Sequence, residues 1–303
     1  MTSTAIRTAR FFRARVTAIT DLTPSFRRFT FGGDDLADYG DPGFDQRVKV
    51  VFPAPEAGLD TMPVDDAWYA TWRDMPEDAR PTFRTYTTRA VRNLRNEVDI
   101  DMVAHDVLGP ASAWIEQASV GDEVLICGPT TAHEGVSFGI DFVPPARSER
   151  ILLAGDETAA PAIAVILEQL AADARGTVVL EVPHADDIAY LPRHPGFDYV
   201  VAARGDGARH AHLVRAVEDV AAQLVPEGRG AEVEEIDIDS DILWEVPRTA
   251  KGGAALKSAP LYAWLAGEAG AIKALRRHLV TDHGVDPRAV AFMGYWRLGR
   301  AEN

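Results

Sequence analysis

The stretch LLAGDETAAPAIAVIL, residues 152–167, decides the architecture of the second half of the chain. It is typical of a buried strand that turns through Gly155-Asp156-Glu157-Thr158 into a helix, with Pro161 in the first helical turn. Doubly wound sheets bind nucleotides at such strand, turn and helix units. The turn lacks the G-x-G-x-x-G pattern, and its two acids would repel a closely held pyrophosphate. The stretch therefore predicts either part of a nucleotide site or a helix start that Asp156 or Thr158 caps.

Apolar runs alternate with amphipathic stretches on the C-terminal side of this unit. The strand-like runs are TVVLEVP (177–183), FDYVVAA (197–203), PLYAWLAG (260–267) and AVAFMGYW (289–296), and the helical ones are HLVRAVEDVAAQLV (212–225) and EAGAIKALRRHLV (268–280). This alternation predicts a parallel sheet covered by helices, an α/β domain. We place that domain at residues 147–303, with the boundary inside the segment VPPARSER (143–150).

Short segments rich in β-branched and aromatic residues fill the first half of the chain. They are FFRARVTAIT (11–20), SFRRFTFGG (25–33), QRVKVVFP (46–53), FRTYTTRAV (83–91), NEVDIDMVAH (96–105) and DEVLICGP (122–129). Six short strands separated by Gly, Pro and Asp predict an antiparallel barrel or sandwich over residues 1–146. The Pro-rich residues 53–82 are expected to form a long surface loop, and one helix is expected to start at Gly109-Pro110.

Composition excludes several classes of protein. The chain has 303 residues, which is typical of two domains, and 31 Lys and Arg against 46 Asp and Glu, a formal net charge of −15 that disfavours binding to nucleic acid or anionic lipid. No apolar run reaches the roughly 20 residues of a membrane helix, so we expect no membrane partner and a cytoplasmic protein. The single cysteine, Cys127, excludes intramolecular disulfides, thiolate zinc sites and Cys-ligated iron–sulfur clusters. Any redox chemistry must then come from a bound cofactor.

The most informative motif is Arg84-Thr85-Tyr86-Thr87-Thr88-Arg89, on a predicted barrel strand. A flavin nucleotide needs a planar surface against its ring, hydrogen bonds to its ring heteroatoms and a cation for its pyrophosphate. Tyr86 can stack, Thr87 can bond the ring, and Arg84 can clamp phosphate. The alternative is a barrel strand with ordinary outward arginines.

Two further stretches suit a flat, phosphate-bearing cofactor. Gly109-Pro110-Ala111-Ser112-Ala113-Trp114 places small residues at a helix start, where free N–H groups favour a phosphate. In the C-terminal FMGYWR (292–297), Trp296 follows a glycine by two residues and can approach a ring. The alternatives are a proline-initiated helix with Trp114 in the core and a last strand that packs its aromatic residues inward. The nicotinamide end of a coenzyme is placed at the turn of residues 155–158.

Other chemistries lack support in the sequence. The eight histidines show no H-E-x-x-H spacing, and no G-x-S-x-G elbow is present. The acidic stretch 231–245 lacks the glycine and the terminal glutamate of a calcium loop, so we expect a solvated segment that leads into a strand. No metal site is predicted.

Five motifs resemble, in order and spacing over residues 8–301, the siderophore-interacting protein family. They are RTYTTR, VDIDMVAH with GPASAW, LLAGDETAAPAIA, YAWLAGEAGAIKALRRHL and AFMGYWRLGRAE. Members of this family are FAD-dependent, NAD(P)H-using ferric-siderophore reductases of the ferredoxin reductase-like superfamily. The resemblance implies a β-barrel plus α/β architecture, with an N-terminal antiparallel six-stranded FAD-binding barrel and a C-terminal parallel-sheet NAD(P)H-binding domain.

The resemblance also implies a set of cofactor-binding residues on both domains. They are Arg84, Tyr86, Thr87 and Arg89 in the first motif, Asp101 and His105, then Ala111, Ser112 and Trp114 at the inserted helix, Asp156, Glu157 and Thr158 at the nicotinamide side, and Gly267 and Glu268 at a later turn, to which we add Trp296. The chain departs from the family at Asp106, where glycine usually follows the histidine, and at Arg47, where histidine is expected. The run RTAKGGAALKS (248–258) is longer than in the smaller members and indicates the subgroup with an extended C-terminal region.

The implied reaction passes a hydride from NAD(P)H to FAD and single electrons from the flavin to Fe(III) in a siderophore, which releases Fe(II). Many ferric chelates are anionic, so an acidic protein needs a local basic patch to accept one. The candidates are Arg47, Lys49, Arg248, Lys251 and Lys257, and the alternative for each is an ordinary surface charge.

Three questions stay open at the level of sequence. The fold also suits another ferredoxin reductase-like flavin enzyme, and a non-catalytic siderophore- or flavin-binding protein is a further alternative. NADH, NADPH and a ferredoxin are all possible electron donors. Arg204 or Arg209, which follow the strand FDYVVAA, can hold the 2′-phosphate of NADPH or can be loop residues without a role.

Overall fold

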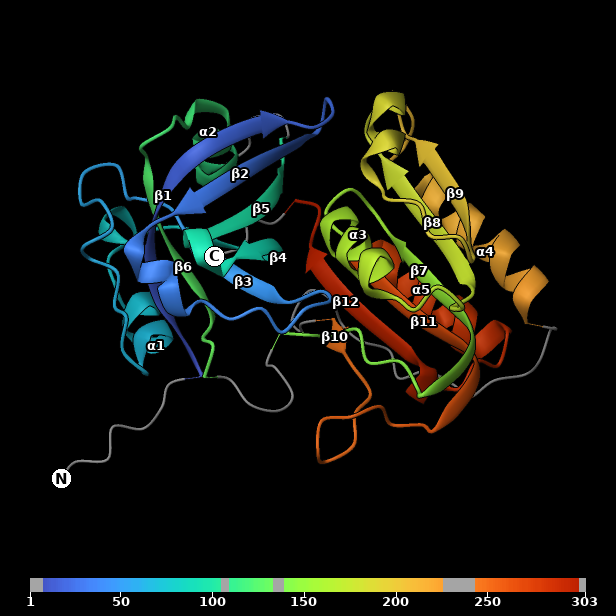
Figure 1. The fold of residues 1–303 in the computed structure, drawn as a ribbon. Helices are drawn as coiled ribbons and strands as arrows, with labels where there is room; N and C mark the ends of the chain where they lie inside the picture. The colour runs from blue at the N-terminus through green and yellow to red at the C-terminus, as the bar shows by residue number, and fades with distance from the viewer. Residues whose placement is uncertain (1–7, 105–108, 133–138, 226–242, 300–303) are drawn as a thin grey trace. The chain divides into compact units, whose positions relative to one another are not determined.

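The computed structural model describes residues 8–104, 109–132, 139–225 and 243–299 (Figure 1). The chain forms two compact units, one ending at Ile140 and one starting at Asp141. None of the helices among the described residues combines the length and the apolar character needed to cross a lipid bilayer.

The first unit is built on a closed antiparallel barrel. Its strands are β1 (Ala9–Asp21), β2 (Phe26–Gly32), β3 (Arg47–Val51), β4 (Phe83–Arg92), β5 (Glu97–Val103) and β6 (Glu123–Pro129). The order β1-β2-β5-β4-β3-β6 closes because β6 pairs with β1 as well as with β3. Alternate residues such as Val98, Ile100 and Met102 are fully buried in its core, as the period of two in the sequence requires. The prediction of a six-stranded antiparallel barrel is confirmed.

Short helices connect the barrel strands. They are η1 (Asp34–Asp38), α1 (Trp68–Arg73), η2 (Glu77–Ala79), η3 (Asn93–Arg95) and α2 (Pro110–Gln117). The expectation that residues 53–82 form only a surface loop is wrong, because α1 lies within them and its Trp72 is 5% exposed. Leu59, Met62 and Trp72 form a second apolar cluster with Val51 and Leu125 of the barrel wall, which anchors this segment.

The second unit is a six-stranded sheet with helices. Its strands are β7 (Arg147–Gly155), β8 (Gly176–Val182), β9 (Phe197–Ala203), β10 (Trp244–Glu245), β11 (Ser258–Glu268) and β12 (Val290–Trp296). Its helical elements are α3 (Ala160–Gln169), η4 (Ala185–Tyr190), α4 (Ala211–Leu224), α5 (Ala269–Arg277), η5 (His278–Asp282) and η6 (Pro287–Ala289). In the order β10-β12-β11-β7-β8-β9, five strands are parallel and the short β10 runs antiparallel to β12. The predicted parallel-sheet domain is confirmed, and of the acidic stretch 231–245 only the last three residues lie among those described.

The direction of winding reverses at β7. The chain goes from β7 outward to β8 and β9, then returns through α4 to β11 on the other side of β7 and continues to β12. Since parallel crossovers are right-handed, the two directions place α3 on one face and α4 with α5 on the other, as Figure 1 shows. Val217 and Leu275 pack with Leu152 and Leu265 of the sheet in one buried cluster. The carboxyl ends of β7 and β11 therefore form the topological switch point, where sheets of this kind bind ligands.

Candidate functional site

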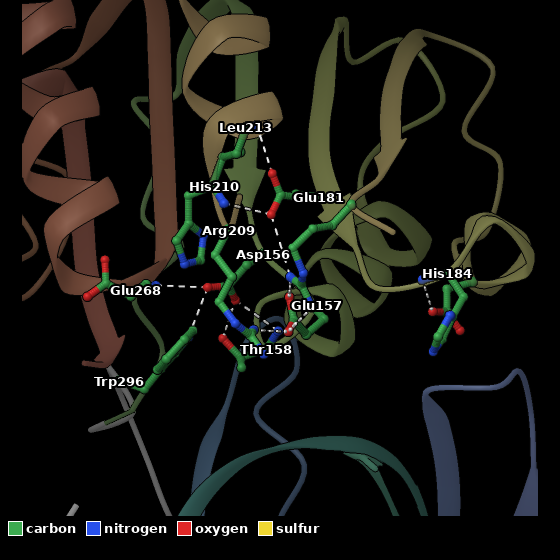
Figure 2. Close-up of polar contacts among 12 residues, drawn as sticks. Asp156, Glu157, Thr158, Glu181, His184, Arg209, His210, Leu213, Glu268 and Trp296 are labelled. Atoms are coloured by element: carbon green, nitrogen blue, oxygen red, sulfur yellow. Dashed lines mark hydrogen bonds and ion pairs between the residues drawn. The ribbon is translucent and has the colours of Figure 1, made fainter. Parts of the chain in front are cut away.

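Asp156 is the centre of the switch point. It directly follows β7, and its buried carboxylate accepts hydrogen bonds at Oδ1 from the backbone N–H (2.9 Å) and the hydroxyl of Thr158. At Oδ2 it accepts from the backbone N–H of Glu268 (2.8 Å) and from Nε1 of Trp296 (2.9 Å), as Figure 2 shows. Residues that follow or end β7, β11 and β12 thus meet at one carboxylate.

Burial dominates the titration of this carboxylate. Removal from water raises the pKa of Asp156, the charge of the adjacent Glu157 raises the pKa further, and the bonds from Thr158 and Trp296 oppose the rise. The net direction is upward from the ordinary value of 3.8. A perturbed carboxyl group at a switch point is a physical sign of a functional site.

The β11 side of the switch point depends on a glycine. Gly267 has a φ of +146°, and a Cβ at this position would lie 2.6 Å from Oδ2 of Asp156. The next residue, Glu268, caps α5 through a hydrogen bond from the N–H of Ala271 to its Oε2 (2.9 Å). The structure thus places Gly267 and Glu268 next to Asp156. The contacts of these two residues hold the turn between β11 and α5.

Glu157 and Glu181 form a buried ion-pair cluster with two arginines. Nη1 of Arg204 lies 3.3 Å from Oε2 of Glu157 and 3.5 Å from Oε1 of Glu181, and Nη1 of Arg209 lies 3.2 Å from Oε1 of Glu157 (Figure 2). Both carboxylates are fully buried. Glu181 also accepts hydrogen bonds from the N–H groups of His210 (2.7 Å) and Leu213 (3.3 Å), so it caps α4 from the neighbouring strand.

His210 is a polar residue at this site that the sequence analysis missed. Its backbone is left-handed, with a φ of +65°, and its ring lies 5.7 Å from the ring of Trp296. The side chain is nearly buried, and neither ring nitrogen has a hydrogen-bond partner among the described residues. Glu181 was missed as well, although a lone acid in the apolar strand TVVLEVP is a signal that such a residue has a buried partner.

The motif on β4 presents its side chains on both faces of the strand. Tyr86 and Arg84 lie opposite Val48 and Val50 of β3, whereas Thr87 lies opposite Arg47. Nη1 of Arg84 donates to the carbonyl of Phe83 (2.7 Å), and no carboxylate among the described residues pairs with Arg84. The half-buried ring of Tyr86 meets Phe52 edge-on at 6.4 Å.

The start of α2 reaches the same aromatic residue. Trp114 packs against Phe52 with ring centroids 4.9 Å apart, so the barrel core joins Tyr86 of β4 to Trp114 of α2. Ala111 is buried, Ser112 is half-buried, and no side chain of the described residues caps the N-terminus of α2. No atom of the described residues lies within 4 Å of where a Cβ on Gly109 would be. An arginine without a carboxylate partner, an aromatic ring, hydroxyl groups and an uncapped helix N-terminus form a donor set that fits FAD.

Arg89 and Asp101 meet in the barrel wall. Asp101 is fully buried, forms a two-pronged pair with Arg28 (2.7 and 2.8 Å) and lies 3.5 Å from Nε of Arg89. Asp101 thus lies between two arginines of the barrel wall. His105, which was predicted to line the nucleotide site, lies outside the described residues.

The candidate basic residues belong to both units. Arg47 and Lys49 lie two positions apart on β3 and so project from the same face of the strand. Nζ of Lys49 lies 4.8 Å from the ring centre of Phe83. In the second unit, Arg248 lies 3.6 Å from Asp141, and Lys251 and Lys257 are exposed. The structure brings Arg47 and Lys49 close together, while Arg248 and Lys251 share one turn closed by the bridge between Arg248 and Ala254.

Comparisons with known proteins agree with this architecture. Residues 15–133 match the siderophore-interacting FAD-binding domain, and residues 148–299 match the siderophore-interacting protein model. The chain is 27% identical over 277 residues to the ferric vibriobactin reductase ViuB of Vibrio cholerae, covering 91% of this chain and 85% of that protein. It is 31% identical over 209 residues to the NADPH-dependent ferric-chelate reductase of Escherichia coli, covering 68% and 76%.

A solved structure is similar to this chain over nearly its whole length. The siderophore-interacting protein SipS from Aeromonas hydrophila matches with a TM-score of 0.68 and 27% identity, covering 97% of this chain and 94% of that one. Since the two family models together match most of the described chain, and the second alone matches half of it, the chain belongs to the siderophore-interacting protein family.

Proposed function

We propose that this protein is an NAD(P)H-dependent ferric-siderophore reductase. The observation that carries the proposal is that one chain contains both an Arg84-x-Tyr86-Thr87 barrel strand and a parallel sheet whose switch point is built around Asp156. The similarity to proteins named ferric vibriobactin reductase and ferric-chelate reductase supports the substrate class. The donor NAD(P)H is a cytoplasmic metabolite, so we propose the cytoplasm as the site of action.

Residues of the first unit would hold FAD. When bound, FAD supplies the redox chemistry, because it takes a hydride from NAD(P)H and delivers electrons singly to Fe(III). Arg84 and the uncapped N-terminus of α2, at Ala111 and Ser112, would bind its phosphates. Tyr86 and Thr87 would contact the ring system. Arg89, Asp101, His105 and Trp114 complete the proposed set, with Arg89 and Asp101 acting as a paired support.

Residues of the second unit would hold the coenzyme. Asp156 keeps the β7 turn, β11 and Trp296 together, which shapes the surface beyond the strand ends. Thr158 and Trp296 would contact the nicotinamide side, and Glu157, Gly267 and Glu268 would set the turns around it. This division of labour implies an FAD-binding domain at residues 1–146 and an NAD(P)H-binding domain at residues 147–303.

The ferric chelate would be drawn by positive charge. Siderophore complexes that carry negative charge need cations in a chain of net charge −15. We propose Arg47, Lys49, Arg248, Lys251 and Lys257 for this role. No protein side chain has to act as a general base in this reaction.

An anaerobic spectroscopic titration tests the proposal. The purified protein, supplied with FAD, is expected to show a flavin band that bleaches with NADH or NADPH and recovers on addition of a ferric siderophore, with Fe(II) trapped by a coloured chelator. Reduced ferredoxin in place of the nucleotide tests the alternative donor. Failure to retain FAD, or a bleached flavin that ferric chelates leave reduced while a flavodoxin or ferredoxin reoxidises it, would contradict the proposal.

A further inference from the structure

His210 has a buried imidazole whose hydrogen-bonding capacity is unused. The residue is 8% exposed, and neither Nδ1 nor Nε2 has a hydrogen-bond partner among the described residues. A neutral imidazole offers one donor and one acceptor, and the large majority of buried polar side-chain atoms in folded proteins are paired. An unpaired buried ring costs stability in the free protein, and a ligand that pairs with the ring recovers that cost.

The backbone of His210 fixes where this ring lies. Its φ of +65° is left-handed, a conformation that few residues other than glycine adopt. The N–H of His210 donates to Oε1 of Glu181 (2.7 Å), and its carbonyl accepts from the N–H of Val214 (2.9 Å). These bonds hold the ring 5.7 Å from that of Trp296, beside the centre of the switch point (Figure 2). The main chain therefore places the ring at the switch point without any hydrogen bond of the ring itself.

The polar side chains around His210 already have partners. Asp156 accepts four hydrogen bonds, which fills the roughly four acceptor positions of a carboxylate. Glu157 and Glu181 both pair with Arg204. The described residues thus leave the ring of His210 for a partner from outside them.

We infer that the imidazole of His210 is a hydrogen-bonding group of the pyridine-nucleotide site, and that it gains its partner when the nucleotide binds. The inference rests on the proposed function, because it presumes that a pyridine nucleotide binds at the switch point. Trp296, which we propose contacts the coenzyme, is half-buried, so a nucleotide that contacts Trp296 reaches the neighbouring ring after a small shift of the two side chains.

The chemistry of the ring indicates which groups of the nucleotide can pair with it. Because a neutral imidazole has one donor and one acceptor, a group that both donates and accepts can pair with either nitrogen. The ribose hydroxyls and the nicotinamide carboxamide of the coenzyme are such groups. Both are present in NAD⁺ and in NADP⁺, so either nucleotide serves as a probe.

Calorimetric titration with NAD⁺ and NADP⁺ tests the inference without electron transfer, on the full-length protein supplied with FAD. His210→Leu is expected to raise the dissociation constant of the nucleotide at least about fivefold, because a hydrogen bond made only in the complex is lost. His210→Asn keeps a donor and an acceptor and tolerates a left-handed backbone, so it is expected to restore part of the affinity. His212→Leu is the matched control, because His212 is an exposed histidine two positions along in α4.

Two further measurements separate a ligand-binding ring from a purely structural one. A ring without partners contributes no hydrogen bond to the fold, so His210→Asn is expected to unfold at nearly the wild-type temperature when no nucleotide is present. In the wild type, ¹⁵N NMR is expected to show the ring nitrogens of His210 shifting on addition of NAD⁺, while those of His212 stay in place. This NMR comparison holds even if the variants at His210 do not fold.

Two smaller ligands identify the group that pairs with the ring. A loss of affinity for 5′-AMP in His210→Leu assigns the ribose of the adenosine half, and a loss for nicotinamide mononucleotide assigns the ribose or carboxamide of the nicotinamide half. Either result supports the inference.

The contrary outcomes separate this inference from the proposed function. Equal nucleotide affinity in the wild type and His210→Leu, ring nitrogens that do not respond to NAD⁺, or a variant that loses stability with unchanged affinity would overturn the inference alone. A wild type that binds no pyridine nucleotide and whose flavin NADH and NADPH leave oxidised would contradict both. If the nucleotides bind and the flavin still stays oxidised, the proposed function fails, and the measured affinities still decide the role of His210.

Discussion

Trp296 and Asp156 stand 140 positions apart in the chain and are joined by a hydrogen bond of 2.9 Å from the indole Nε1 to Oδ2. The two residues belong to β12 and to the turn after β7, and β11 lies between these strands in the sheet. The indole therefore reaches across the end of β11 to a carboxylate that also receives the N–H of Glu268. Hydrogen bonds to Asp156 thus hold the ends of β7, β11 and β12 together where we propose that the coenzyme binds.

Removing the indole N–H of Trp296 is expected to weaken the connection between the strand ends. We expect Trp296→Phe to lower the free energy of unfolding by about 1 kcal/mol, because the buried carboxylate loses one of its hydrogen bonds. We also expect slower flavin reduction by the coenzyme, measured by stopped-flow spectroscopy. Trp68→Phe, whose ring contacts are all in the first unit, is the control. A Trp296→Phe protein with wild-type stability and wild-type rates would contradict the role assigned to the bond.

The raised pKa of Asp156 predicts a pH dependence of stability. A carboxyl group whose pKa is higher in the folded state than in the unfolded state holds its proton longer when folded, so its contribution to stability falls as pH rises. The loss begins near the unfolded value of 3.8 and continues through the raised folded value. Urea unfolding of wild type and Asp156→Asn from pH 4 upward measures this, and the wild type is expected to lose stability relative to the variant as pH rises. A relative gain would show that the four donors hold the pKa below its ordinary value.

Gly267 cannot accept a side chain. We expect Gly267→Ala to cost at least about 1 kcal/mol of stability, because its φ of +146° is one that L side chains rarely adopt and its Cβ would lie 2.6 Å from Oδ2 of Asp156. Coenzyme-dependent flavin reduction should fall with it. Gly205→Ala is a matched control, since Gly205 also has a positive φ (+53°) but no described atom within 4 Å. Equal losses of stability in both variants would mean that backbone strain alone is responsible.

Arg84 is expected to contribute directly to FAD affinity. We expect Arg84→Ala to raise the dissociation constant of FAD by at least about tenfold, because a charge-assisted bond to a phosphate is worth about 1.5–3 kcal/mol. Quenching of flavin fluorescence on binding measures this constant. Arg15→Ala removes an exposed barrel arginine that pairs with Glu123 and should leave the constant unchanged. Equal affinities in both variants would remove Arg84 from the site.

Steady-state kinetics can distinguish what the individual basic residues contribute to binding of the ferric chelate. We expect Lys49→Ala to raise the Michaelis constant for an anionic ferric chelate severalfold, with little change for a neutral one, because the lost attraction is electrostatic. The double variant Lys251→Ala with Lys257→Ala tests the exposed lysines of the second unit in the same way. Unchanged constants for every chelate would mean that these lysines are ordinary surface charges.

Local pattern explains what was predicted correctly. The alternation in FRTYTTRAV and the apolar run before Gly155 identify strands by period and composition, and the apolar face around Val217 identifies a helix. The buried residues of α4 follow the helical period. In β5 the alternate apolar residues are buried as predicted, but Asp99 and Asp101 between them are buried as well, because both pair with arginines. The surface-loop prediction for residues 53–82 failed because it weighed prolines and charges above Trp72, which finds a buried place on the barrel wall.

The sequence by itself determined the class of each half, the family resemblance and the motifs at Arg84 and Asp156, because strand and helix periods and short motifs are local properties of the chain. The strand pattern alone left open whether the first half closes as a barrel or opens as a sandwich, and only the family resemblance implied a barrel. Only the tertiary structure decided that β6 pairs with both β1 and β3, that Trp296 bonds to Asp156, and that Glu157 binds the two arginines. These contacts join residues distant in sequence, and burial in the folded chain is what makes each buried charge require a partner.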